Sequence, residues 1–236
     1  MQKHIENSLN KANNYESNID NQVLNIDGMT GVKTRHLYNN LCSLDNIRYL
    51  EIGSWKGSSI CSAMSNNNIT CLCIDNWCKF EGSGANDLKE YFGENINDTI
   101  SVKKEFINNF NNFKGSNNAK YIENNCWDIC VNQLGKFNIY MYDGEHSEES
   151  HFLALKYYLP CLDNEFIYII DDWNWECVQI GTYNSITHNS CEIIYKTEIF
   201  TNNKNHPKWG NGEGIRAGKH GDWHNGICIF ILRKPI

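Results

Sequence analysis

Proline and long apolar runs are scarce in this chain. Only 3 of its 236 residues are proline. The longest apolar runs, FIYII and GICIFIL, fall far short of the about 20 residues that a membrane-spanning helix needs. The N-terminal stretch MQKHIENSLNKANN is polar and lacks the apolar core of a signal peptide. We therefore expect a cytoplasmic protein without membrane insertion.

Positive charge is also in short supply. The chain has 21 Lys and Arg residues against 28 Asp and Glu residues, which gives a formal net charge of −7. This balance disfavours general attraction to the phosphate backbone of nucleic acids or to anionic membrane surfaces. With 41% hydrophobic and 21% charged residues, the composition is that of a globular protein that buries a substantial core.

The 11 cysteines include no C-x-x-C pair. Cys71 and Cys73 alternate along an apolar run, and Cys126 and Cys130 have the spacing of neighbours on one helix face. Because thiols stay reduced in the cytosol, we interpret the cysteines as small, buried apolar residues. A zinc site is the alternative interpretation, and the spacing does not support it.

Short apolar runs alternate with helical patterns along the chain. Strands are predicted at residues 47–53, 69–75, 119–123, 137–143, 166–171, 192–200 and 227–232, and helices at 29–42, 58–64, 101–113, 148–159 and 175–187. This alternation predicts a mostly parallel sheet covered by helices on both faces, with an antiparallel last strand. Thr30 is the expected cap of the first of these helices. We expect residues 1–28 to be a polar helical lead-in and residues 29–236 a single domain.

Acidic residues follow four of the predicted strands. They are Glu51, Asp75, Asp143 and the pair Asp171–Asp172. Ligands of open α/β sheets bind outside the carboxyl ends of the strands. Acids that gather at one edge repel one another unless a cation or the polar groups of a ligand compensate their charge. We therefore expect a ligand site at this edge, with separate solvated turns as the alternative.

The turn after the first strand, EIGSWKGSS at residues 51–59, has the features of a cofactor loop. Gly53 permits a sharp strand exit, and Gly57 stands at a helix start, where free N–H groups point outward. Asp75 ends the next strand, where an acid can bind both hydroxyls of a ribose. Trp55 occupies the place of the second glycine of G-x-G-x-x-G, which disfavours a nicotinamide cofactor. The pattern favours an adenosine-type cofactor.

Several segments together resemble the motifs of class I S-adenosylmethionine-dependent methyltransferases. YLEIGSWKGSS is similar to their first motif, and CIDNW is similar to their second, acidic motif. YMYDGEHS and YIIDDW resemble the paired motifs of small-molecule O-methyltransferases, including those that methylate sugar hydroxyls with a divalent metal. MTGVKTRHLYNNL is similar to the cofactor-covering helix of that subgroup. A weaker likeness is to methyltransferase domains that modify the glycans of large DNA viruses.

This resemblance implies a Rossmann-like sheet, S-adenosylmethionine as cofactor, and methyl transfer to a hydroxyl of a sugar or glycan. The implied cofactor-binding residues are Glu51, Gly53, Ser54, Gly57, Asp75, Asn76, Trp77, Asn125, Cys126 and Asp143. Glu51 and Gly53 would lie against the methionine portion. Asp75 would hold the ribose hydroxyls, and Trp77 would pack on the adenine. The family commonly has an acid where this chain has Asn125, so that contact stays open.

The resemblance also implies a metal site formed by Asp143, Asp171 and Asp172. Asp143 and Asp171 end neighbouring strong strands with one helix between them, so their carboxylates can converge. Hard oxygen ligands without Cys or His favour Mg²⁺, Mn²⁺ or Ca²⁺ over zinc. A cation bound there would lower the pKa of the acceptor hydroxyl and orient it toward the methyl carbon.

The acceptor hydroxyl must also lose a proton. His146 is the leading candidate for the base, because it follows Asp143 by three residues and its unperturbed pKa suits neutral pH. A structural place at the start of the next helix and a cofactor contact are alternative roles for His146. Asp143 itself and a histidine of segment 203–226 are alternative bases.

Segment 203–226, NKNHPKWGNGEGIRAGKHGDWHNG, combines aromatic, basic and glycine residues. Aromatic rings stack on sugar faces while Arg and His side chains reach hydroxyls, so the composition favours a carbohydrate acceptor. Its glycines would also suit a lid. The predicted substrate contacts are Trp173, Arg216, His220, Trp223 and His224. An ordinary surface loop is the alternative.

Three rival functions compete with this interpretation. The first is a catechol-type O-methyltransferase with an aromatic acceptor, and the tryptophan-rich segment does not distinguish it from a sugar-methylating enzyme. Amino-methylating nucleic-acid methyltransferases generally need an N-P-P-Y-like turn after the fourth strand, where this chain has DGEH. That difference and the acidic balance predict no nucleic-acid partner. A non-catalytic binding module is disfavoured because all three metal-type acids are retained. The sequence does not indicate the oligomeric state.

Overall fold

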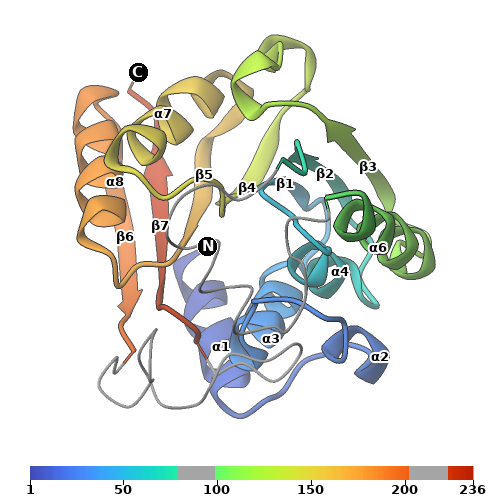
Figure 1. Ribbon diagram of the computed structural model, residues 1–236. Coiled ribbons are helices and arrows are strands. Elements are labelled where there is room, and N and C mark those ends of the chain that lie inside the picture. The colour runs from blue at the N-terminus through green and yellow to red at the C-terminus, as the bar shows by residue number, and fades with distance from the viewer. Residues whose placement is uncertain (79–98, 202–222, 236) are drawn as a thin grey trace.

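The computed structural model describes residues 1–78, 99–201 and 223–235 of the chain. Its centre is a seven-stranded sheet in the order β3-β2-β1-β4-β5-β7-β6, with helices on both faces (Figure 1). The strands are β1 (Arg48–Ile52), β2 (Thr70–Asp75), β3 (Asn118–Glu123), β4 (Phe137–Tyr142), β5 (Leu162–Asp171), β6 (Glu192–Ile199) and β7 (Ile227–Arg233). The predicted sheet is thereby confirmed in all seven of its strands.

The first five strands pair in parallel, and β7 runs antiparallel to both of its neighbours, β5 and β6. The prediction of a mostly parallel sheet with an antiparallel last strand is confirmed. Parallel strands bring their carboxyl ends to one edge, so the turns after β1, β2, β4 and β5 meet there. Because β7 runs the other way, the residues that precede it reach the same edge.

Two sets of helices cover the two faces of the sheet. The helices are α1 (Gln2–Asn13), α2 (Asn21–Leu24), α3 (Val32–Leu41), α4 (Ser58–Met64), α6 (Thr99–Phe113), α7 (Glu148–Tyr158) and α8 (Glu176–His188). One core joins α1, α3, α4 and α6 to the sheet, and a second core joins α7 and α8 to the opposite face. Along β4, Ile139 and Met141 enter the first core while Tyr140 and Tyr142 enter the second. Burial on both faces explains why central strands such as β4 and β7 read as nearly continuous apolar runs.

Residues 1–28, expected as a helical lead-in, form α1 and α2. Ile5, Leu9 and Val23 of this segment belong to the first core. Arg35 on α3 is fully buried and ties the segment down. Its guanidinium donates to the backbone carbonyls of Val23, Leu24, Ile26, Gly28 and Thr30. Burial lowers the pKa of Arg35 to about 10, so it remains charged at neutral pH. The division of the chain at residue 28 stays a prediction.

Three local expectations are corrected or left aside. The N-cap of α3 is Gly31, and the predicted cap Thr30 instead shares a hydrogen bond of 2.9 Å with Ser58. Cys126 and Cys130 do not share a helix face, because separate 3-10 helices span Cys126–Asp128 and Val131–Gln133. A third 3-10 helix spans Leu159–Cys161.

All 11 cysteines are free thiols in the described part of the chain, and six of them are buried. Residues 79–98 and most of segment 203–226, which includes predicted substrate contacts, lie outside the described residues.

No helix in the described ranges is long and apolar enough to cross a membrane.

Candidate active site

The turn after β1 packs directly against the turn after β4. Gly53 has a φ of +84°, and a Cβ atom there would lie 1.9 Å from the backbone oxygen of Asp143. Gly57 has a φ of +87° and is the N-cap of α4. Only glycine adopts such angles at low cost and permits so close an approach. The glycine turn predicted from EIGSWKGSS therefore sets the distance between β1 and Asp143.

Asp75 holds the glycine turn in shape. Its Oδ2 accepts hydrogen bonds from the backbone N–H groups of Ser54 at 2.7 Å and Trp55 at 2.9 Å. Its Oδ1 accepts from the backbone N–H of Trp77 at 2.7 Å. A carboxylate has about four acceptor positions, so this residue retains capacity for a ribose hydroxyl. The predicted ribose-binding acid is thus also the residue that shapes the loop.

Glu51 lies beneath the same turn and is fully buried. Its carboxylate accepts hydrogen bonds from the hydroxyls of Tyr49 at 3.0 Å, Ser54 at 2.7 Å and Ser59 at 2.9 Å. Burial raises the pKa of Glu51 to about 8, although the three hydroxyl donors act in the opposite direction. Glu51, which was expected against the methionine portion of a cofactor, is therefore buried beneath the turn and holds it by hydrogen bonds.

The residues expected around the adenine are divided between the core and the surface. The Trp77 ring is buried, with its centroid 4.7 Å from that of Phe106, and its Nε1 donates to the backbone oxygen of Trp55. That packing leaves little of the ring for a cofactor. Asn76 and Asn125 are exposed at the ends of β2 and β3, and Cys126 beside them is half-buried.

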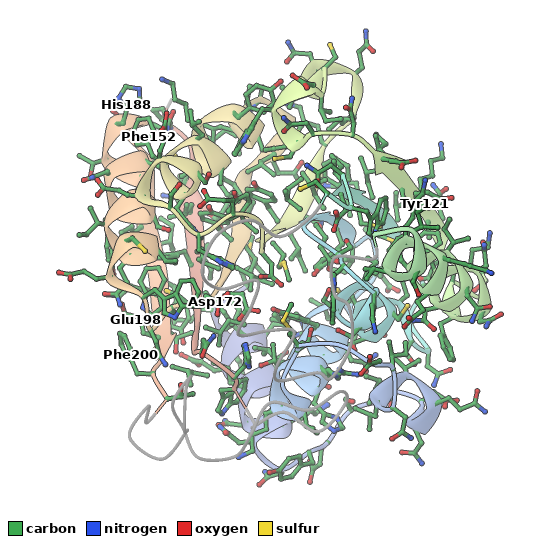
Figure 2. The ribbon with its side chains drawn as sticks, viewed as in Figure 1. Tyr121, Phe152, Asp172, His188, Glu198 and Phe200 are labelled. Atoms are coloured by element: carbon green, nitrogen blue, oxygen red, sulfur yellow. The ribbon has the colours of Figure 1, made fainter. Side chains whose placement is uncertain are left out.

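Asp143, His146 and Asp172 converge at the carboxyl edge of β4 and β5. Each offers one possible ligand atom, and these atoms all lie within 4.8 Å of one another. The Nε2 atom of His146 lies 2.8 Å from Oδ2 of Asp172 and 3.8 Å from Oδ1 of Asp143. Within the described residues, this nitrogen has no partner at a hydrogen-bonding angle. Asp172 has a φ of +54° and is almost entirely buried, in the interior of the molecule (Figure 2). Such strain in a non-glycine residue is concentrated at functional sites.

The charges of this cluster compensate one another. Burial by itself lowers the pKa of His146, but the charges of Asp172 and Asp143 outweigh it and hold that pKa well above its usual range. Burial raises the pKa of Asp172, yet the charge of His146 holds it well below its usual range. Burial raises the pKa of Asp143 to about 6 against the same imidazole. His146 is thus the cation of the cluster when no metal ion is present.

Asp171 lies outside the cluster, although it was predicted as the third metal ligand. It pairs with Ile227 of β7 and shares a strand face with Ile167 and Ile169, toward α3. Its charge contributes to the raised pKa of Tyr38 on that helix. Burial, followed by the charges of the two neighbouring aspartates, holds the pKa of Asp171 well above its usual range. Among the described residues, the third member of the cluster is His146, which was predicted as the base.

The three predicted substrate contacts that the structure describes, Trp173, Trp223 and His224, are buried. Trp173 is fully buried, and its Nε1 donates to Oε1 of Glu198 at 3.0 Å, so it cannot face an acceptor. Trp223 and His224 are buried just before β7, and the predicted contacts Arg216 and His220 lie outside the described residues. Trp175 is a partly exposed aromatic residue beside the cluster. Its ring centroid lies 4.8 Å from that of His146, and the two rings are nearly perpendicular.

Two further residues were missed by sequence reasoning. Lys56 lies within the glycine turn, and its Nζ is 2.6 Å from Oδ2 of Asp27 and 3.1 Å from Oε2 of Glu105. It ties the turn to the N-terminal segment and to α6, and its place between Trp55 and Gly57 was the only available signal. Asn225 donates a hydrogen bond to Asp172 at 2.7 Å. Asn225 and Asp172 are far apart in the sequence, and no local pattern links them.

The sequence of residues 50–173, more than half of the chain, matches the model of a protein family described as methyltransferase domain. The chain therefore belongs to this methyltransferase family. A search of curated proteins finds no match.

Solved structures share the fold at low sequence identity. An O-methyltransferase from Bacillus cereus, in complex with SAH, is 10% identical with a TM-score of 0.50, over 98% of this chain and 91% of that chain. A Staphylococcus aureus protein described as a caffeoyl-CoA O-methyltransferase is 12% identical with a TM-score of 0.52, over 91% and 88%. TrmN from Thermus thermophilus is 8% identical with a TM-score of 0.49, and the match covers 86% of this chain but 48% of TrmN. This chain thus spans about half the length of TrmN.

The family and the fold together confirm the class of protein expected from the motifs. The sheet is the Rossmann-like sheet of class I methyltransferases, which use S-adenosylmethionine. Identities this low show the fold and leave the acceptor to be argued from the site.

Proposed function

We propose that this chain is an O-methyltransferase that methylates a hydroxyl of a sugar or glycan, with a divalent cation at the acceptor site. The observation that carries the proposal is the cluster of Asp143, His146 and Asp172 at the carboxyl edge of the sheet. It lies beside the turn of Gly53, where the cofactor of an open α/β sheet is bound. Acceptor and methyl donor would therefore meet at one place.

The residues of the β1 and β2 turns fit S-adenosylmethionine. Asp75 ends β2, is only partly buried, and has acceptor capacity left for a ribose hydroxyl. Asn76 and Asn125 are exposed beside it and offer amide groups for the adenine edge. Glu51 acts through the turn, because it holds the Ser54 hydroxyl in place from below. In this assignment Trp77 supports the loop and does not stack on the adenine.

The acid cluster fits a divalent cation. Its two carboxylates supply the hard oxygen ligands that Mg²⁺ and Mn²⁺ prefer. Burial raises the pKa of Asp143 to about 6, so a nearby positive charge would favour the ionised form of this carboxyl. When bound, the cation supplies Lewis-acid chemistry that makes an acceptor hydroxyl easier to deprotonate. Asp143 and Asp172 are the residues that would hold it.

His146 is the residue that we assign as the base. In the metal-free site its pKa is held well above the usual range by Asp172 and Asp143, so at neutral pH it already carries its proton. A cation held by these two carboxylates would weaken that cause, and His146 would then be the group placed to accept the proton of the acceptor hydroxyl. The base would therefore become active only in the loaded site.

Trp175 supports a sugar acceptor. Its ring borders His146 and is partly exposed, so a pyranose face stacked on it would bring hydroxyls to the imidazole. A catechol ring would stack on the same surface, and this is the second candidate acceptor. Methyl-transfer assays with sugars and with catechols distinguish the two acceptors.

The direct test is transfer of a labelled methyl group onto monosaccharides, glycans, catechols and RNA, with Mn²⁺ and with a chelator. We expect transfer to a sugar or glycan that stops on chelation and returns when Mn²⁺ is added. Transfer only to catechols or to RNA would replace the proposed acceptor. Activity that survives chelation would remove the metal from the proposal, and calorimetry without S-adenosylmethionine binding would remove the cofactor assignment.

Replacement of His146 by alanine tests the assigned base. General-base catalysis contributes about 10²–10⁴-fold, so we expect turnover to fall by about that factor. The affinity for Mn²⁺, measured by electron paramagnetic resonance, should change by less than about threefold, since both carboxylates remain. His188→Ala, at an exposed histidine on α8, is the matched control and should leave both quantities unchanged. Mn²⁺ binding that collapses together with turnover would make His146 a ligand.

A further inference from the structure

Asn225 connects the last strand of the sheet to the acid cluster. Its side chain is almost fully buried, with 3% of its surface exposed, and it lies two residues before β7. The Nδ2 atom donates to Oδ1 of Asp172 at 2.7 Å. The other carboxylate oxygen of Asp172, Oδ2, lies 2.8 Å from Nε2 of His146. The two oxygens of Asp172 thus have different partners, one an amide and the other the cluster.

The backbone around Asn225 is held on both sides. The antiparallel pairing of β5 and β7 continues past Asp171, since the Asn225 carbonyl accepts from the backbone N–H of Asn174 at 2.8 Å and the Gly226 carbonyl accepts from that of Trp173 at 3.3 Å. Gly226 has a φ of +85°, and a Cβ there would lie 2.6 Å from the backbone oxygen of Ile199. The position of the amide is therefore set by the sheet.

We propose that Asn225 is a positioning residue that determines which oxygen of Asp172 is presented to the cation. This inference rests on the proposed metal site. The amide occupies Oδ1, so Oδ2 is left to face His146 and Asp143. A neutral amide donor orients the carboxylate without adding a positive charge that would compete with a metal ion. Hydrogen-bond partners of metal ligands commonly change metal affinity by about 10–100-fold when they are removed.

Binding of Mn²⁺ to the full chain, without cofactor or acceptor, tests this role. Asn225→Leu removes the donor while nearly preserving the volume, and we expect the dissociation constant for Mn²⁺ to rise by about 10–100-fold. The electron paramagnetic resonance spectrum of the bound ion should also change, because the carboxylate is then free to bind through both oxygens. Asn225→Ala is measured in parallel and gives the answer if the leucine variant does not fold.

Gln179→Leu is the matched control. Its Nε2 donates to the backbone oxygen of Trp173 at 2.7 Å, in the same turn after β5, but the bond involves no carboxylate. Its Mn²⁺ affinity should equal that of the wild-type chain. A folded Asn225 variant that binds Mn²⁺ within threefold of wild type, with an unchanged spectrum, overturns the positioning role alone. A wild-type chain that does not bind Mn²⁺ overturns the metal site and this role together.

Discussion

Replacement of Asp172 by asparagine is expected to lower the rate of methyl transfer by roughly 10³-fold or more. The amide has nearly the same size and its oxygen can still accept the hydrogen bond from Asn225, so charge is removed while shape is kept. A metal ion contributes several kcal/mol to the stabilisation of developing charge, and each 1.4 kcal/mol corresponds to about tenfold in rate. Labelled methyl transfer and Mn²⁺ affinity should fall together.

The same variant has a signature that does not depend on activity. In the metal-free chain, the charge of Asp172 is the largest influence that raises the pKa of His146. The stabilising contribution of a raised histidine is fully present below its unfolded pKa of about 6.5, and is lost as the pH rises through the folded pKa. Asp172→Asn lowers that folded pKa, so the loss should occur at lower pH. Titration of the His146 ring proton by NMR measures this shift directly.

Asp128→Asn is the control for both measurements, because Asp128 is an exposed acid that follows β3 at the same edge of the sheet. It should leave the transfer rate and the pKa of His146 unchanged. An Asp172→Asn variant with near wild-type turnover would show that this carboxylate has no part in the reaction.

Replacement of Gly53 by alanine is expected to reduce the free energy of unfolding by about 2–5 kcal/mol. The left-handed conformation at a φ of +84° costs a side chain about 1–2 kcal/mol, and forced overpacking adds about 1–3 kcal/mol. The new Cβ would lie 1.9 Å from the backbone oxygen of Asp143, which cannot swing aside as a flexible side chain could. Urea unfolding at equilibrium measures the change.

Gly135→Ala separates the two causes. Gly135 has a φ of +90°, but no atom of the described residues lies within 4 Å of the position that a Cβ would take there. Its replacement should therefore cost only the conformational term of about 1–2 kcal/mol. Equal losses for the two variants would mean that the β1 and β4 turns yield easily, and that the close approach at Gly53 does not set the position of Asp143.

Much of the fold could be predicted because its signals are local. Helix α4 begins and ends where the pattern of SSICSAM places it, and β2 differs from its prediction by one residue. Acids at the ends of strands could be predicted to gather at one edge of the sheet, since parallel strands have their carboxyl ends on the same side. The glycine turn was recognised because a positive φ leaves a residue-type signal in the sequence.

The composition of the acid cluster could not be predicted in the same way. The sequence YIIDDWNW continues a strand pattern, but the φ of +54° at Asp172 ends the alternation of faces. Asp171 therefore stays on the strand face toward α3, Trp173 enters the core, and Trp175 reaches the site. The contact of Asn225 could not be predicted for a different reason. Its contact with Asp172 depends on the order of strands, which local patterns do not contain.

That order also bears on how the chain is made. Strand β7 is inserted between β5 and β6, so the strands synthesised earlier leave a gap in the sheet that only residues 227–233 fill. Ribosomes add about 5–20 residues per second, and until this segment emerges the edge of β5 presents unpaired backbone N–H and C=O groups on that side. Asn225 arrives with the same segment. The strand that pairs with the exposed edge of β5 and the residue that bonds to Asp172 of the acid cluster therefore emerge together in the nascent chain.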